Sequence, residues 1–347
     1  MSDPQNLQAF PPPPVDDRAL FDLSLGLYGY YAVVVAFELG LFARLAQRPA
    51  TAEEIARHFG LGARSTEALL LSSLSLGLLE RQRDRYGLSP TGRTYLLPES
   101  RTYFGDYIQE VVIDQWRMTS LPAVRRAVLE EHPQVNEAEA VFASMPHQEE
   151  QARIFTRRMH GHSIASALAW PLRFDLAEVG HMVDVGGGSG AHAIGAALRW
   201  PQLTATVFEM ATVAPVAEEF VQQYALAERI AVARGDFWAE PLPAGDLHFY
   251  GDIFHDWPDE RCPALMAKSF AALPPGGRIM IHEVLYDDDK SGPFQAAAHS
   301  VAMLVWTEGR QRSGPEYGAM LEAAGFAEVA VDRVFGYWGI VSARKPR

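Results

Sequence analysis

Cysteine is almost absent from this chain, because Cys262 is the single example among 347 residues. One thiol excludes an intrachain disulfide framework and fits a reducing compartment, so we expect a cytoplasmic protein. Basic residues are also scarce: 30 Lys and Arg stand against 43 Asp and Glu, which gives a formal net charge of −13. A field of this sign repels nucleic acid and anionic membranes. The composition therefore favours a small-molecule substrate and argues against nucleic-acid or membrane partners.

Long apolar runs are missing as well. The most apolar segment, Tyr30–Phe37, is too short to span a bilayer, and we expect a buried helix there. Residues 1–17 carry a proline run without a basic start and an apolar core, so we expect a disordered leader rather than a signal peptide. The pair His160 and His162 is not enough for a metal site, and no other histidine or cysteine spacing suggests one. No metal is therefore expected.

The length and a change of pattern predict two domains after the leader. Helical patterning dominates residues 18–174, whereas strands and helices alternate over 175–347. Within the first domain, a helix ends at Gly60, a second covers Ser65–Leu76, and Leu79–Ser89 has the pattern of a hairpin. This order predicts a winged helix. Its second helix has almost no cations and many leucines, which favours a dimerisation role over DNA binding.

The second domain has the pattern of a parallel sheet with crossover helices. Its last two predicted strands are joined by Phe335 and Gly336 alone, and so short a connection joins only antiparallel strands. We predict an α/β fold with a Rossmann-like, doubly wound sheet that ends in an antiparallel hairpin. The predicted strands are His181–Val185, Leu203–Glu209, Ile230–Arg234, Asp246–Tyr250, Arg278–Glu283, Glu328–Val334 and Tyr337–Ala343.

A glycine-rich turn, VDVGGGSG at Val183–Gly190, connects the first strand to a helix. Glycines such as Gly186 and Gly188 allow positive φ and let a ligand approach the backbone, and the amides at the helix start favour an anionic group. Enzymes that use NAD have the same device, so the turn alone leaves the cofactor open.

Acidic residues at strand ends narrow the choice of ligand. Glu209 closes the second strand, where a carboxylate can accept from both ribose hydroxyls. Asp236 closes the third strand, where it could accept from an adenine amino group, and Asp184 stands near the expected place of a methionine amino group. The alternative for Glu209 and Asp236 is that they are ordinary solvated loop carboxylates.

Four motifs together resemble the plant-type O-methyltransferase family, which includes caffeic acid and flavonoid methyltransferases and bacterial antibiotic-tailoring relatives. They are VDVGGGSG with the acidic end of the next strand, RGDFW at Arg234–Trp238, HDWPDE at His255–Glu260, and PPGGRIMIHE at Pro274–Glu283 before the closing hairpin. The resemblance covers nearly the whole chain from about Tyr30. It implies S-adenosylmethionine as cofactor, a homodimer, and methylation of a small, often phenolic, hydroxyl.

The resemblance also implies further ligand contacts. Met210 and Phe237 follow the two strand-end carboxylates and are expected beside the cofactor, and Trp257 is expected either beside its adenosine or in the core. The expected substrate wall consists of Phe155, Met159, His162, Met303 and Trp306. The first three share one helical face, so a core role is an equal alternative for this set.

The expected chemistry centres on His255, five residues beyond the fourth strand at the edge where ligands of such sheets bind. A neutral imidazole there can accept the proton of the hydroxyl during methyl transfer. Glu283, at the end of the fifth strand, is expected to orient the ring, as a family glutamate does. The alternatives are a hydrogen-bonded structural histidine and an ordinary strand-end carboxylate.

Gln311 departs from the family pattern, which usually has a second glutamate at this position. An amide can hold a histidine or a substrate by hydrogen bonds, but it carries no charge that would stabilise imidazolium. The departure leaves room for a carbon or nitrogen acceptor, or for a relative that binds the cofactor and runs another reaction.

Overall fold

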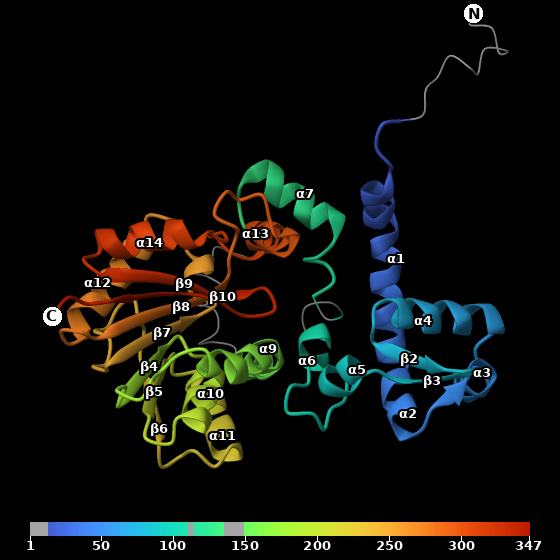
Figure 1. Cartoon of the computed structure of the whole chain (residues 1–347), viewed down its shortest axis with the longest axis horizontal. Coiled ribbons are helices and arrows are strands. Elements are labelled where there is room, and N and C mark those ends of the chain that lie inside the picture. The colour runs from blue at the N-terminus through green and yellow to red at the C-terminus, as the bar shows by residue number, and fades with distance from the viewer. Residues whose placement is uncertain (1–12, 110–112, 114, 135–148) are drawn as a thin grey trace, which may run out of the picture. The chain divides into compact units, whose positions relative to one another are not determined.

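The computed structural model describes residues 13–109, 113, 115–134 and 149–347. Residues 1–12 of the predicted leader lie outside this set. The chain forms two compact units, Met1–Tyr103 and Phe104–Arg347. Both can be followed by colour in Figure 1.

The first unit confirms the winged helix. Thr51 and Glu54 form the capping box of α3, because Oγ1 of Thr51 accepts from the Glu54 amide at 3.2 Å while the Thr51 amide donates to Oε2 of Glu54 at 2.9 Å. Gly60 ends this helix in the left-handed region, with φ +66°. The strands pair antiparallel in the order β1-β3-β2. The elements of this unit are α1 (Arg18–Glu38), α2 (Leu41–Gln47), β1 (Ala50–Thr51), α3 (Ala52–Phe59), α4 (Ala63–Ser75), β2 (Leu79–Gln82), β3 (Arg85–Leu88) and α5 (Pro90–Tyr95).

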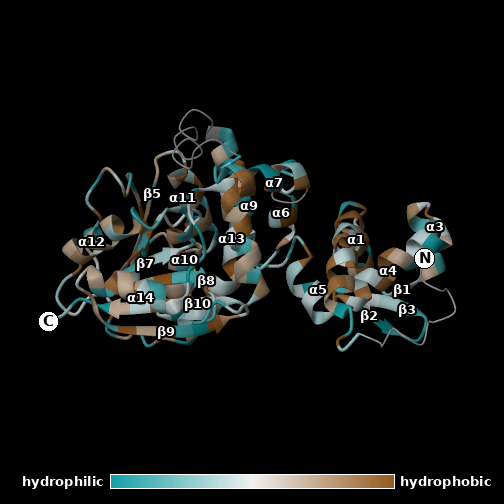
Figure 2. Cartoon of the chain, turned by 90° about the horizontal axis from the view of Figure 1, so that it is seen from above, coloured by the Kyte–Doolittle hydropathy of each residue, from teal (hydrophilic) through white to brown (hydrophobic). Residues whose placement is uncertain are grey.

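The expectation of a buried helix at Tyr30–Phe37 is wrong for the single chain. Helix α1 is 21 residues long, and only Ala36 on it is buried. It packs against α2 and α4, but many of its apolar side chains remain exposed; the brown segments of α1 in Figure 2 mark its apolar residues. By length and composition α1 could also cross a membrane. Its exposed large apolar side chains are Leu20, Phe21, Leu23, Leu25, Leu27, Tyr28, Tyr30, Tyr31 and Val35.

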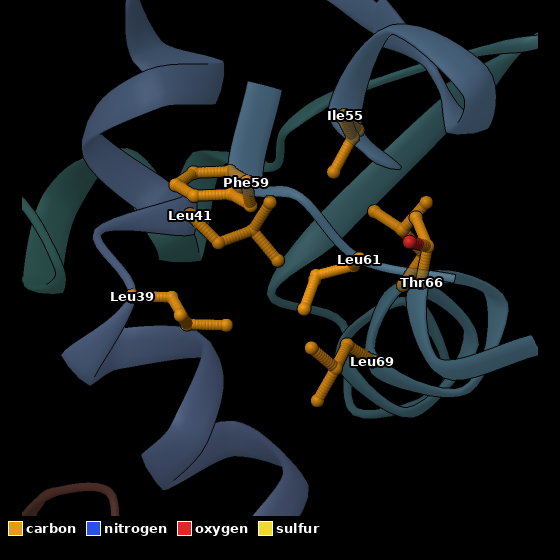
Figure 3. A pocket seen from close by; sticks show the side chains of 8 residues that line it. Leu39, Leu41, Ile55, Phe59, Leu61, Thr66 and Leu69 are labelled. Atoms are coloured by element: carbon orange, nitrogen blue, oxygen red, sulfur yellow. The ribbon is translucent and has the colours of Figure 1, made fainter. Parts of the chain in front are cut away.

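A small hollow lies in the first unit where α2, α3 and α4 meet (Figure 3). Its lining is apolar except for the hydroxyl of Thr66, which donates to the Gly62 carbonyl inside its own helix. With no titratable group in its wall, this hollow offers no acid–base chemistry and belongs to the packing of the winged helix.

The second unit is built on a sheet of seven strands in the order β6-β5-β4-β7-β8-β10-β9. The first five in this order run parallel, and β10 pairs antiparallel with both β8 and β9. This confirms the doubly wound sheet with a closing antiparallel hairpin. The strands are β4 (His181–Val185), β5 (Thr204–Glu209), β6 (Ile230–Arg234), β7 (Leu247–Gly251), β8 (Arg278–Val284), β9 (Ala327–Phe335) and β10 (Trp338–Arg344).

Helices cover both faces of the sheet (Figure 1). One face packs against α9, α10 and α11, and the other packs against α12 and α14. Alternation along β4 sends Met182 to the first core and Val183 to the second. The helices of this unit are α6 (Gly105–Tyr107), α7 (Leu121–Glu130), α9 (Glu149–Ala169), η4 (Trp170–Leu172), α10 (Ala191–Arg199), α11 (Ala214–Gln223), η5 (Phe254–Asp256), α12 (Cys262–Ala272), α13 (Phe294–Trp306) and α14 (Gly314–Ala323).

The boundary between the units differs from the predicted one at 174/175, because it falls at 103/104. Helix α9 explains the difference. Its Ile164 and Ala167 pack with Ala191 of α10, and a Cβ added at Gly195 would overlap the carbonyl of Ala167. The glycine thus allows α9 to lie directly on α10, and the helix joins the core of the sheet rather than that of the winged helix.

Candidate functional site

The glycine-rich turn leaves β4 at the carboxyl edge of the sheet and enters α10. Gly186, Gly188 and Gly190 all have positive φ, at +64°, +56° and +75°. A Cβ at Gly186 would stand 2.6 Å from Cδ1 of Ile253, whereas nothing lies within 4 Å of a Cβ at Gly188. The turn is therefore closed at its start and open at Gly188, where a ligand can approach the backbone.

Glu209, at the end of β5, is held against the open part of this turn. Its Oε2 accepts from the Gly188 amide at 2.8 Å and its Oε1 accepts from the Met210 amide at 2.7 Å. Burial raises the pKa of the carboxyl, and the two amides oppose that rise. Each oxygen keeps a further lone pair, so the carboxylate remains able to accept from hydroxyls of a ligand. Met210 is half-buried beside it.

Asp236 and Phe237 follow β6 at the same edge of the sheet. Asp236 is exposed, and its Oδ1 accepts from the Trp238 amide at 2.7 Å. Phe237 borders the glycine turn, because its ring would stand 3.3 Å from a Cβ at Gly186. Trp257 is buried, with its ring 4.8 Å from that of Trp238, and its place beside adenosine stays a prediction.

Asp184 has a different place from the expected one. Its side chain is fully buried behind the turn, and its Oδ2 accepts from the Ala193 amide of α10 at 3.0 Å. Burial raises the pKa of this carboxyl to about 7. Strand alternation points Asp184 toward the helices on that face of the sheet, so it supports the turn from behind instead of reaching a ligand amino group.

The open glycine turn, with Glu209 beside it, fits the cofactor that the sequence predicts. The space at Gly188 admits a ligand at the backbone, and Glu209 offers a negative acceptor at the same point. Asp236 lies at the end of β6, the strand that pairs with β5, which carries Glu209. Carboxylate acceptors in this order suit ribose hydroxyls followed by an adenine amino group.

The predicted pair His255 and Glu283 does meet. His255 lies in η5, just after β7, and its Nδ1 is 2.6 Å from Oε2 of Glu283 at the end of β8. Its backbone amide also donates to Oε1 of the same carboxylate, at 3.2 Å. Sequence reasoning missed two further carboxylates here: Asp256 Oδ1 lies 3.4 Å from Nε2 of His255, and Asp252 Oδ1 lies 3.7 Å from Nδ1. These four residues form the His255 cluster.

Charges within the His255 cluster decide its protonation. Burial lowers the pKa of His255, but Glu283, Asp256 and Asp252 together outweigh burial and raise that pKa to about 10. Burial raises the pKa of Asp256 to about 6 and that of Asp252 well above its usual range, although His255 opposes both changes. At neutral pH the ring therefore carries a proton and neutralises part of the surrounding negative charge.

A loop from Gly309 to Ser313 holds the turn of His255 from behind. Arg312 is fully buried and donates to the carbonyls of Phe254 at 2.8 Å and Trp257 at 2.9 Å. The same guanidinium binds Oδ1 of Asp259 at 2.6 Å. A Cβ at Gly309 would overlap the carbonyl oxygen of His255, so the two backbones are in close contact. The loop therefore fixes the backbone on both sides of the histidine.

Comparison with known proteins decides the family. The model of a family described as the O-methyltransferase domain matches residues 123–327, and that of the O-methyltransferase dimerisation domain matches residues 21–98. The chain belongs to the O-methyltransferase family. It is an S-adenosylmethionine-dependent methyltransferase of the plant type that the motifs predict.

Relatives align along nearly the whole methyltransferase. The 3-hydroxy-5-methyl-1-naphthoate 3-O-methyltransferase of Streptomyces sahachiroi is 36% identical over 326 residues, which cover 93% of each chain. The N,N-dimethyltransferase OxyT of Streptomyces rimosus is 30% identical over 344 residues, 96% of this chain and 98% of its own. The crystal structure of human N-acetylserotonin methyltransferase in complex with S-adenosylmethionine has a TM-score of 0.82 at 28% identity, covering 97% of this chain and 100% of the other.

Of the predicted substrate wall, the structure brings His162 to the His255 cluster. Its Nε2 lies 3.7 Å from Oδ2 of Asp252, and its ring stacks on Tyr107 with centroids 4.7 Å apart. Burial, and then the charge of His255, lower the pKa of His162 to about 4, so this ring is neutral. Tyr107 gave no signal in the sequence. The half-buried Phe155, Met159 and Trp306 and the buried Met303 stay predictions.

Gln311 does hold a histidine by its amide, but the partner is His299 rather than His255. Nε2 of Gln311 lies 3.0 Å from Nδ1 of His299, and the Gln311 side chain is fully buried. His299 lies on α13 with its ring centroid 5.1 Å from that of His255. It was missed because a lone histidine in an apolar helical segment is most often part of a core.

The His255 cluster also bears on the expectation that the methyltransferase has no metal. Possible ligand atoms of Asp252, His255 and Glu283 all lie within 4.8 Å of one another, a separation that could hold a divalent cation. Sequence spacing could not reveal this group, because Asp252 and His255 follow β7 whereas Glu283 lies at the end of β8. In the present geometry the hydrogen bond between His255 and Glu283 occupies two of the three positions. The expectation of no metal stays a prediction.

Proposed function

We propose that this methyltransferase transfers a methyl group to a hydroxyl of a small aromatic metabolite, with His255 as the general base. The observation that carries the proposal is the 2.6 Å hydrogen bond between Nδ1 of His255 and Oε2 of Glu283. This bond fixes the ring through Nδ1, and Nε2, which lies 3.4 Å from Oδ1 of Asp256, can accept a proton once the ring is neutral. S-adenosylmethionine, when bound, supplies an activated methyl group, so the side chains have to bind the acceptor and remove its proton.

The raised pKa of His255 suits a phenolic acceptor. A phenol has a pKa of about 10 and an ordinary imidazolium about 6.5, so a complete proton transfer between them is uphill by roughly 5 kcal/mol. The pKa of His255 is about 10, close to that of a phenol, so proton transfer from the phenol to the neutral ring is nearly balanced in free energy. The same shift means that the free ring is protonated at neutral pH and must lose that proton before it can act. Activity is therefore expected to increase with pH.

The relatives support the substrate class. The Streptomyces sahachiroi protein is named for a naphthoate hydroxyl, an aromatic acceptor. In this chain the stacked rings of Tyr107 and His162 lie beside the His255 cluster, and flat apolar faces of this kind suit an aromatic ligand.

A nitrogen acceptor is the second candidate. The observation that favours it is Gln311, an amide where the family usually has a glutamate, together with the similarity to a Streptomyces rimosus enzyme named as an N,N-dimethyltransferase. A protonated amine becomes nucleophilic once it has lost one proton, and His255 could accept this proton as well.

We also propose that the methyltransferase is a homodimer. A dimerisation domain matches residues 21–98, and the exposed apolar side chains of α1 lie within that range or at its edge. A second copy would bury the face of α1 that the single chain leaves in water.

Product analysis tests the proposal directly. The purified enzyme is incubated with methyl-labelled S-adenosylmethionine and a panel of phenols, naphthols and aromatic amines, and products are identified by mass spectrometry. Label on an aromatic oxygen supports the first candidate, and label on nitrogen supports the second. Tight S-adenosylhomocysteine binding without any labelled product refutes both.

A further inference from the structure

His299 is a second imidazole beside the proposed base that the reaction outlined above does not use. It lies on α13, and its ring plane is inclined by 56° to that of His255 at a centroid separation of 5.1 Å. The residue is only partly buried, and burial, followed by the charge of His255, keeps its pKa low, at about 3. The active site therefore pairs a protonated ring with a neutral one.

Gln311 fixes both the position and the proton of this neutral ring. Its Nε2 lies 3.0 Å from Nδ1 of His299, and its backbone amide donates to Oγ of Ser300 at 3.0 Å, so the loop is tied to α13 at two adjacent residues. In this orientation of the Gln311 amide its nitrogen faces Nδ1 and only donates, so Nδ1 is the acceptor. The proton of the neutral ring is then on Nε2. Among the described residues, none hydrogen-bonds this Nε2.

This arrangement accounts for the departure at Gln311. A glutamate in the same place would draw the proton to Nδ1 and favour a second imidazolium next to His255, which is already charged. The amide instead leaves the ring neutral and turns its N–H away from the loop. Gln311 is thus the hydrogen-bond partner of His299, and Glu283 remains the carboxylate partner of His255.

We propose that His299 is a specificity-determining residue that donates from Nε2 to a second oxygen of the acceptor, on the ring carbon next to the methylated hydroxyl. The substrate class is then a vicinally dioxygenated aromatic, such as a catechol-type diol or an ortho-hydroxy carbonyl compound. The proposal rests on the proposed function, because His255 defines where the hydroxyl lies. Two imidazoles 5.1 Å apart can each serve one of two neighbouring oxygens, whereas a ring with one hydroxyl leaves Nε2–H of His299 unpaired.

The experiment compares two acceptors that differ only in the second oxygen. The full-length enzyme, saturated with S-adenosylhomocysteine, is titrated by calorimetry with 2,3-dihydroxynaphthalene and with 2-naphthol. The parent should bind the diol about tenfold more tightly, the effect of one satisfied hydrogen bond. His299→Phe should reduce the ratio to near one by weakening diol binding alone. Gln311→Met, which keeps the length of the side chain but not its donor, should reduce the ratio in the same direction.

Gln295→Ala, an exposed position on the same helix, is the matched control and should keep the parent ratio. The proposal is overturned if the parent has no preference, if neither compound binds, or if the preference survives both His299→Phe and Gln311→Met. Equal weakening of both compounds also overturns it, because that outcome indicates packing. Binding is measured without methyl transfer, so a retained diol preference in an enzyme that makes no methylated product refutes the proposed function and leaves the role of His299 intact.

Discussion

Replacing His255 by glutamine tests the proposed base most directly. The variant loses the group that accepts the proton, and turnover should fall by roughly 10²–10⁴, the usual contribution of positioned proton transfer. Cofactor affinity should stay near that of the parent, because the predicted cofactor cradle, Glu209 with the turn at Gly188, has no hydrogen bond to His255. The assay measures kcat with labelled S-adenosylmethionine, and calorimetry measures S-adenosylhomocysteine binding.

The pH dependence gives this test a second and independent readout. Only neutral imidazole accepts a proton, and the pKa of His255 is raised to about 10 by its carboxylate neighbours. The rate of the parent should therefore rise with pH through the neutral range and level off as the ring deprotonates. Glu283→Gln removes the charge that stabilises the imidazolium, so the rising limb should move to lower pH while the plateau falls. Glu322→Gln, an exposed glutamate on α14, should leave the profile unchanged.

Two outcomes would refute the reasoning. One is a His255→Gln enzyme that keeps more than a tenth of the parent turnover, and the other is a flat pH profile in the parent. Either result would favour a carbon acceptor or a reaction other than methylation.

Four further predictions concern the cofactor cradle, the loop behind His255, a possible metal in the His255 cluster, and helix α1. Glu209→Gln should weaken S-adenosylmethionine binding by about 1.5 kcal/mol or more, because a charged acceptor is lost; calorimetry measures this against Glu218→Gln, a half-exposed glutamate bound to an arginine. Arg312→Lys should lower kcat about tenfold and shift the pH profile, because the loss of one or two hydrogen bonds frees the turn that carries His255. Arg310→Lys is the control, since Arg310 lies in the same loop but has no bond to the turn carbonyls, and it should change neither kcat nor the profile. Equal effects of the two variants would contradict a positioning role for Arg312. Exhaustive dialysis against EDTA should leave activity unchanged, whereas a loss that one divalent cation restores would identify the His255 cluster as a metal site. Leu23→Glu should turn a dimer into a monomer in sedimentation velocity at micromolar concentration, and a monomeric parent would contradict the homodimer.

The sheet and the meeting of His255 with Glu283 could be predicted from the sequence, because strand ends follow from local pattern. Two predicted strands, His181–Val185 and Ile230–Arg234, have the bounds that the structure gives them. Parallel neighbours then bring the ends of β7 and β8 to one edge, and this places the two site residues side by side.

Other features depend on contacts that local pattern does not encode. Asp184 lies near the end of β4, just before the glycine turn, but the direction of its side chain follows from strand alternation and the packing of α10. His299 became recognisable only when the fold placed it against Gln311. The helical pattern of α9 in the sequence did not indicate which of the two domain cores this helix joins. The apolar surface of α1 stays exposed in the single chain and needs a partner to become buried.

The antiparallel hairpin affects how the site assembles during folding. Strand β8, which carries Glu283, has β7 on one side and β10 on the other, and Val284 pairs with Trp338 across a long stretch of intervening sequence. Until β10 arrives, β8 is an unprotected edge of apolar residues such as Ile279 and Ile281, open to pairing with another chain. Because this closure is non-local, it is slow compared with helix formation. We therefore expect that truncation within β10 would leave the apolar edge of β8 exposed. The main effect should be aggregation during synthesis rather than a loss of activity in a folded enzyme.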